Sequence, residues 1–144
     1  MEVAREQIVA EARKWLGTPW VHGVTDCAQL VMNVGKDLSA FRPGALEDPF
    51  MRQFDGYPET YIPKRMIKAL NFLLVRTDET KLGDVCLFFI KGSPQHLGII
   101  SRRPGDHMYI IHGFNKPSMM MVVESRIINP GHILGTWQFP MVEK

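Results

Sequence analysis

Cysteines are scarce in this chain, long apolar runs are absent, and charge of one sign is nowhere concentrated. Two cysteines among 144 residues are too few for a disulfide scaffold. No stretch approaches the roughly 20 apolar residues that cross a bilayer, so we expect no membrane span. The net charge is +2, with Lys and Arg scattered among Asp and Glu, which argues against a nucleic-acid partner.

An export signal is also missing from the N-terminal stretch "MEVAREQIVAEARKWLG". The stretch is amphipathic and charged throughout, whereas a signal peptide has an apolar centre followed by a cleavage site. We therefore expect cytoplasmic synthesis without a signal peptide, and we expect Cys27 and Cys86 to be free thiols. The sequence has no internal repeat, and its length suits one globular domain over residues 1–144.

Helical periodicity marks the first half of the chain. Apolar residues at helical spacing predict helices over residues 3–16, 27–38 and 63–74. Either Thr25 or Asp26 can cap the second of these helices, because both residue types favour that position.

The connection over residues 39–61 is rich in Pro, Gly and aromatic residues. Long connections in compact domains tend to be functional, so we expect residues 41–61 to border a substrate groove. The alternative is that the rings seal the core beneath the connection. The aromatic residues concerned are Phe41, Phe50, Phe54, Tyr57 and Tyr61.

Strand patterns begin at residue 83. Short runs rich in β-forming residues are separated there by turn signals. Helices first and an antiparallel meander second are the order of an α+β fold, with the N-terminal helices packed on the sheet. The predicted strands cover residues 84–90, 96–101, 108–112, 119–124 and 134–139.

Three residues of this arrangement can form a catalytic set. Cys27 opens the second predicted helix, where the positive helix end and a neighbouring imidazolium lower the pKa of a thiol. His96 begins one strand and His112 ends the next. If the hairpin pairs Ser101 with His107, the two histidines lie directly opposite each other, with Cβ atoms about 4.5–5.5 Å apart. An even register shift keeps them on one face, and an odd shift separates them.

Two functional interpretations of the histidine pair stay open. With Cys27 the pair can form a Cys-His-His catalytic set, or the three side chains can hold a metal ion. The sequence has no HxH, HExxH or CxxC motif that would strengthen the metal interpretation, and we expect no metal. Taken singly, each of these residues can also be a structural one. Cys86 lies inside the apolar run "VCLFFI" and is expected to be a core thiol.

Several segments resemble the NlpC/P60 family of papain-like cysteine peptidases. "ARKWLGTPWVHG" and "DCAQLV" are similar to the family's first helix, its Gly-Thr-Pro-aromatic loop and its Asp-Cys helix start. "LGDVCLFF", "QHLGIIS" and "MYIIHG" are similar to its strands, the second of which carries the base. "VVESRI" and "TWQFP" resemble the phage-associated branch. The resemblance runs nearly end to end and implies an α+β, papain-like NlpC/P60 fold.

The resemblance also implies a role for each site residue. Cys27 matches the nucleophile, His96 the general base, and His112 the third polar residue, which holds the base in its productive tautomer. Family members hydrolyse amide bonds in peptidoglycan stem peptides through an acyl-enzyme. The implied reaction needs neither a cofactor nor a metal.

The chain departs from the family pattern around the nucleophile. Ala28 and Gln29 follow Cys27 where the family usually has Ser-Gly, and Trp20 stands where it often has Tyr. The backbone N–H of Cys27 is then the expected oxyanion donor. The substrate contacts that we expect are Trp20, Asp26 and Tyr57.

Three functions follow as hypotheses. The first is a cell wall endopeptidase, derived from a phage tail or a prophage, which the virion delivers to peptidoglycan from outside. The second is a tail assembly protein, with phage tail proteins as partners, in which catalysis is weak or lost. The third is an acyltransferase that passes the acyl group to another amine or lipid. An intact Cys27–His96–His112 geometry favours the first over the second, and product identity separates the first from the third.

Overall fold

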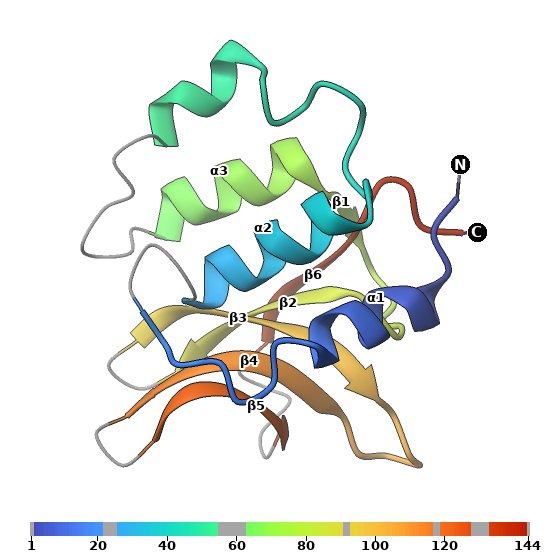
Figure 1. The fold of residues 1–144 in the computed structure, drawn as a ribbon, viewed down its shortest axis with the longest axis vertical. Coiled ribbons are helices and arrows are strands. Elements are labelled where there is room, and N and C mark those ends of the chain that lie inside the picture. Colours follow the sequence, from blue (N-terminus) through green and yellow to red (C-terminus); the bar gives the residue numbers. More distant parts are fainter. Residues whose placement is uncertain are drawn as a thin grey trace.

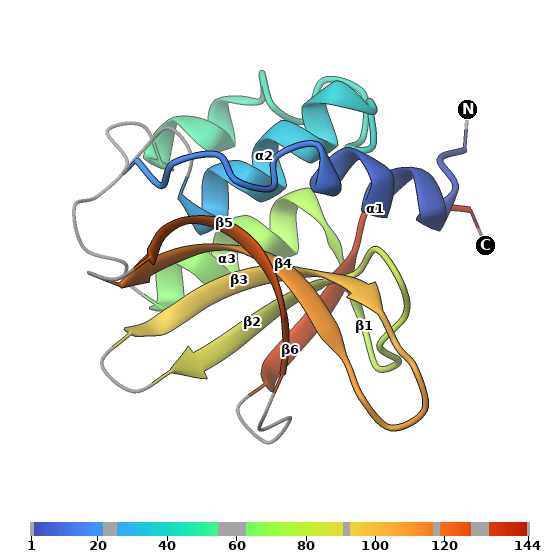
Figure 2. The same ribbon diagram turned by 60° about the horizontal axis from the view of Figure 1, so that its bottom comes forward.

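The fold is a sheet covered on one face by helices, as the computed structural model shows (Figure 1; Figure 2). The structure describes residues 2–21, 26–54, 63–90, 93–116, 119–127 and 133–143. Within these ranges, no helix is both long enough and apolar enough to cross a membrane. The helices are α1 (Arg5–Arg13), α2 (Cys27–Asp37) and α3 (Pro63–Leu73), and the 3-10 helix η1 (Pro49–Phe54) precedes α3.

The sheet has six strands in the order β1-β6-β2-β3-β4-β5, and its neighbours pair antiparallel. The α+β class is therefore confirmed. The predicted meander is correct for β2 to β5 but wrong for β6, which returns to lie between β1 and β2. β1 is not among the predicted strands, because three residues are too few to show an alternating pattern. The strands are β1 (Val75–Thr77), β2 (Val85–Ile90), β3 (Ser93–Arg102), β4 (Tyr109–Lys116), β5 (Met119–Arg126) and β6 (Ile133–Gln138).

Both faces of the sheet carry apolar residues, because successive side chains of a strand point to opposite sides. Buried apolar residues with odd numbers in β2, β3 and β4 belong to the main core beneath the helices. Those with even numbers form a smaller cluster on the other face, which consists of Cys86, Phe88, Ile100 and Ile110.

α2 and α3 match the predicted helices to within one residue, whereas α1 ends at Arg13, short of the predicted residue 16. The chain turns at Gly17, whose φ of +84° suits a residue without a Cβ. It then runs beside β5: the Gly17 N–H donates to the Val122 carbonyl and the Trp20 N–H to the Met120 carbonyl, both at 2.9 Å. These bonds to the sheet explain why the first helix stops early.

Two of the aromatic rings in the connection after α2 pack into the fold. Phe41 is buried and its ring lies 5.7 Å from that of Phe139, while Phe50 stacks on Phe72 of α3 at 4.3 Å. Phe41 belongs to the main core and also lines a pocket, whereas Phe50 is half-buried against α3, so the predicted substrate groove along this connection stays a prediction. Tyr57 lies outside the described residues.

An ion pair between Arg5 of α1 and Asp84, the residue before β2, holds α1 against the sheet. Arg5 Nη1 donates to Asp84 Oδ1 at 2.7 Å and to the Leu82 carbonyl at 2.9 Å. The other carboxylate oxygen accepts from the Lys81 N–H at 2.9 Å. Burial raises the pKa of Asp84, and the bonds from Arg5 and Lys81 oppose that shift. Asp84 therefore has a structural role.

Candidate active site

Asp26 begins α2 and makes Cys27 its first residue. The Asp26 carboxylate accepts the Gln29 N–H at 2.9 Å, and its backbone carbonyl accepts the Leu30 N–H at 3.0 Å. This confirms the predicted cap. Asp26 is fully buried, so the expected substrate contact is corrected: its carboxylate is enclosed and holds the start of the helix.

The described ladder between β3 and β4 ends close to the beginning of α2. Their ladder runs from Arg102↔Tyr109 inward, and its last described pair is Ile99↔Ile111. Beyond this pair, β3 continues its ladder with β2, and β4 continues with β5. The start of β3, the end of β4 and the start of α2 lie on the same side of the molecule (Figure 1; Figure 2).

Gly113 brings the start of α2 against β4. A Cβ on this residue would lie 3.2 Å from the Cys27 backbone nitrogen and 3.1 Å from Trp20 Cδ1. A side chain at this position would be tighter than an ordinary carbon contact, and glycine avoids that crowding. Because Gly113 follows His112 in the chain, the backbone of the predicted nucleophile lies beside the neighbour of one predicted histidine. Trp20, which is half-buried, lies at the same place.

The two predicted histidines form a hydrogen bond with each other. His96 Nε2 lies 2.5 Å from His112 Nδ1, and the rings meet edge to face with centroids 4.7 Å apart. On the other side, His112 Nε2 lies 2.7 Å from Ser125 Oγ. The prediction that both imidazoles share one face of the sheet is confirmed.

The predicted register of this pair is wrong by two residues. The pairing Ile99↔Ile111 puts Gly98 opposite His112, with His96 on the diagonal. Next to the turn, Arg102 pairs with Tyr109, three residues away from the predicted register, and the irregularity between Ile100 and Arg102 takes back one residue, so the net shift is two. Because the shift is even, the side chains keep their face.

Gly98 leaves room beside His112 for the diagonal contact. A Cβ on Gly98 would lie 3.5 Å from the Cβ of His112 and 2.9 Å from Ile110 Cδ1. Without a side chain at this position, the imidazole of His96 can reach across to His112, as diagonal neighbours with long side chains do.

Both imidazoles are neutral at pH 7. Burial lowers the pKa of His96 to about 4. Burial and, after it, repulsion from His96 lower the pKa of His112 to about 3. His112 is 4% exposed. The hydrogen bond between the rings therefore joins two neutral groups. In its neutral form, the imidazole of His96 can accept a proton and act as a base.

Cys27 and the histidine pair approach the strands from different sides. Cys27 is 3% exposed and belongs to the main core under the helices. The histidines have even numbers and share the other face with Phe88, whose ring lies 6.1 Å from that of His96. A catalytic set therefore requires the Cys27 sulfur to reach His96 near the end of the described β3–β4 ladder. The described contacts of His96 are with His112 and Phe88, so the bond from the sulfur stays a prediction.

Cys86 and His107 do not belong to the candidate catalytic set. Cys86 is fully buried in the smaller cluster, as predicted for a core thiol, and burial followed by repulsion from Asp84 raises its pKa to about 12. His107 is exposed, as its turn sequence suggests. Among the described residues, no group of three or more His, Cys, Asp and Glu side chains gathers to hold a metal ion.

Ser125 is the site residue that the sequence analysis does not include. A serine in a strand carries no motif of its own. Its position depends on the register of the hairpin between β4 and β5, in which His112 pairs with Val123. That register places Ser125 diagonally across from His112, on the same face.

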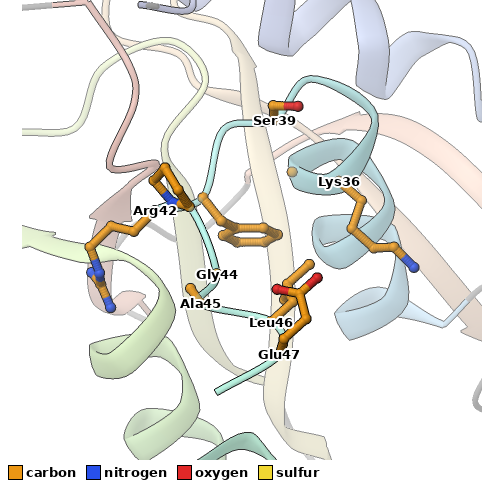
Figure 3. A pocket seen from close by; sticks show the side chains of 10 residues that line it. Lys36, Ser39, Arg42, Gly44, Ala45, Leu46 and Glu47 are labelled. Carbon is orange, nitrogen blue, oxygen red and sulfur yellow. The ribbon is translucent and has the colours of Figure 1, made fainter.

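A pocket of about 310 Å³ lies at the far end of α2. α2 has 11 residues, so at about 1.5 Å per residue its two ends are roughly 15 Å apart. The pocket is open and mixed in character, and it is separate from the histidine pair. Its lining includes Lys36, Ser39, Arg42, Leu46 and Glu47 (Figure 3).

No family model matches the chain, and no curated protein matches it either. The likeness to the NlpC/P60 family therefore stays a resemblance of short motifs. The arrangement of Cys27, His96 and His112 is then the main support for a function.

Proposed function

We propose that this protein is a cysteine peptidase of papain-like NlpC/P60 fold that hydrolyses amide bonds in peptidoglycan stem peptides. The observation that carries the proposal is the 2.5 Å bond between His96 Nε2 and His112 Nδ1, close to the point where α2 begins with Cys27. A thiol at a helix start and two bonded imidazoles supply a nucleophile, a base and a group that orients the base.

The proposed reaction follows from the nitrogen that each ring uses. His96 directs Nε2 to His112, so Nδ1 is the nitrogen that accepts the proton of the Cys27 thiol. The thiolate attacks the carbonyl carbon, the C–N bond breaks, and the leaving amine takes the proton from His96. Water then attacks the thioester, gives its proton to His96, and releases the acid as Cys27 regains its thiol.

The low pKa of His96 means that the thiolate and the imidazolium must form together. A buried neutral imidazole is a weak base until a negative charge appears beside it. The thiolate supplies this charge, and the partial positive charge at the start of α2 stabilises the thiolate. Burial of the pair thus keeps His96 unprotonated and ready to accept a proton.

The substrate class comes from the motifs quoted above, and the segments similar to the phage-associated branch suggest how the chain reaches the wall. A virion that carries the protein in its tail brings it to peptidoglycan from outside. A tail assembly protein with lost catalysis predicts no product, and an acyltransferase predicts a product joined to an added amine or lipid.

Digestion of purified peptidoglycan, followed by mass analysis of the fragments, tests the proposal. The wild-type protein should release stem-peptide fragments with new amino and carboxyl ends, and Cys27→Ala should release none. Cys86→Ala is the matched control, because it removes the other thiol, and it should keep the product pattern. Thermal unfolding of each variant shows that the domain is folded. Undiminished cleavage by Cys27→Ala would rule out covalent catalysis by this residue.

A further inference from the structure

Ser125 extends the histidine pair into a row of three bonded side chains. Its Oγ lies 2.7 Å from His112 Nε2, and His112 Nδ1 lies 2.5 Å from His96 Nε2. The three residues come from the neighbouring strands β5, β4 and β3. Within the described contacts, the row ends at His96, whose Nδ1 is the nitrogen assigned above to the thiol proton.

The position of one proton in this row sets all the others, because each ring nitrogen of a neutral histidine is either a donor or an acceptor. If His112 donates from Nε2 to Ser125, its Nδ1 accepts from His96 Nε2, and His96 Nδ1 has a free lone pair. If Ser125 donates instead, His112 donates from Nδ1 to His96 Nε2, and His96 carries its proton on Nδ1. Only the first arrangement leaves His96 able to take a proton from a thiol.

We infer that Ser125 is a positioning residue: it accepts the Nε2 proton of His112 and thereby fixes the tautomers of both histidines. Its catalytic consequence rests on the proposed function, whereas the tautomers themselves exist without any substrate. Burial supports the inference, since His112 is 4% exposed and a buried N–H that loses its partner is costly. In the first arrangement, His96 also keeps its bond to His112 when it takes up a proton, because Nε2 donates both in the neutral ring and in the imidazolium.

Long-range ¹H–¹⁵N NMR of the wild-type protein at pH 7 measures the tautomers directly, because protonated and unprotonated ring nitrogens of histidine have separate ¹⁵N shifts. The expected spectrum has the proton on Nε2 and not on Nδ1 in both His96 and His112. A spectrum with the proton on Nδ1 of His112 would overturn the inference without the use of any variant.

Ser125→Ala removes the acceptor and should shift the His112 proton to Nδ1. The value of kcat for peptide release should fall about 10- to 100-fold, because the active tautomer must then hold the Nε2 proton of His112 without the Ser125 acceptor, at the cost typical of a buried donor that loses its partner, while KM changes little. Ser125→Thr keeps a hydroxyl and should restore both the tautomers and most of kcat. Ser101→Ala is the matched control, because Ser101 is buried and donates to Glu124 at the same 2.7 Å, and it should change neither.

The outcomes separate this inference from the proposed function. Unchanged tautomers in Ser125→Ala would overturn the role of Ser125, whatever the activity. A wild-type protein with the expected tautomers but no hydrolysis would contradict the proposed function and leave the role of Ser125 supported. If Ser125→Ala does not fold, the wild-type and Ser125→Thr spectra still decide, because both must show the proton of His112 on Nε2.

Discussion

Gly113→Ala tests whether close backbone contact holds the start of α2 beside the histidine pair. The new methyl group would lie 3.2 Å from the Cys27 nitrogen, 3.3 Å from the Asp26 carbonyl carbon and 3.1 Å from Trp20 Cδ1. Carbon atoms at optimal contact are about 3.5–4.0 Å apart. The helix start must therefore withdraw from β4 by a few tenths of an ångström.

The size of the effect follows from what the methyl group meets. Two of its three neighbours are backbone atoms of Asp26 and Cys27, which the helix cap holds in place and which cannot rotate away as a side-chain end can. Overpacking of this kind costs about 1–3 kcal/mol, which for a domain of this size lowers Tm by roughly 3–10 °C. A displacement of about 1 Å can reduce a rate about 100-fold, so a few tenths predict a loss of roughly 3- to 10-fold in kcat.

Gly135→Ala provides the matched control. A Cβ on Gly135 in β6 would lie 2.8 Å from the guanidinium of Arg76 and 2.9 Å from Trp137, so this strand is also crowded, but not by α2. Circular dichroism gives Tm, and peptide release from peptidoglycan below Tm gives kcat. Both variants should lose stability, and only Gly113→Ala should lose kcat. If Gly113→Ala is as stable and as active as the wild type, the close contact does not hold the site. Equal kcat losses in both variants would attribute the effect to general destabilisation.

Three further predictions concern the thiols and the histidines. Iodoacetamide near neutral pH should alkylate Cys27, and Cys86 should react only after unfolding, since burial raises its pKa to about 12; peptide mapping that finds Cys86 labelled first would contradict this. His112→Asn should retain more activity than His112→Ala, because the amide oxygen can accept the His96 Nε2 proton; equal losses would mean that His112 does not orient the base. The free energy of unfolding should fall as pH drops from about 6.5 towards 4. In this range His96 and His112 bind protons in the unfolded chain but stay neutral in the folded protein, because their pKa values are lower there. Urea midpoints should show a shallower fall in His112→Asn, and an unchanged slope would mean that His112 does not contribute.

The sequence predicts local elements better than their order in the sheet. The helix from Cys27 and the helix from Pro63 are found to within one residue, because capping residues and apolar spacing act over a few positions. The position of β6 between β1 and β2 is a long-range arrangement, and no turn residue encodes it. The early end of α1 has the same kind of cause, since the backbone after Gly17 bonds to β5.

The candidate site shows the same division between local and long-range information. Alternation along the strands is enough to place His96 and His112 on one face, and it survives a register error of two residues. Ser125 requires the register of a second hairpin, which the turn sequence before β5 does not fix. The burial that lowers both histidine pKa values is likewise a property of the packed sheet.

Two glycines of neighbouring strands lie near the end of the described β3–β4 ladder. Gly98 points to the face of the histidines, and its missing side chain lets His96 reach His112 across the diagonal. Gly113 points to the opposite face, and its missing side chain lets the backbone of Cys27 approach β4. In a strand a glycine weakens the element, so two of them on either side of His112 are a cost to the sheet. This cost has an explanation if a neighbouring group must come close to each face of the sheet at this position. The Cys27 thiol has to approach from the face covered by the helices, and the His96–His112 pair occupies the other face.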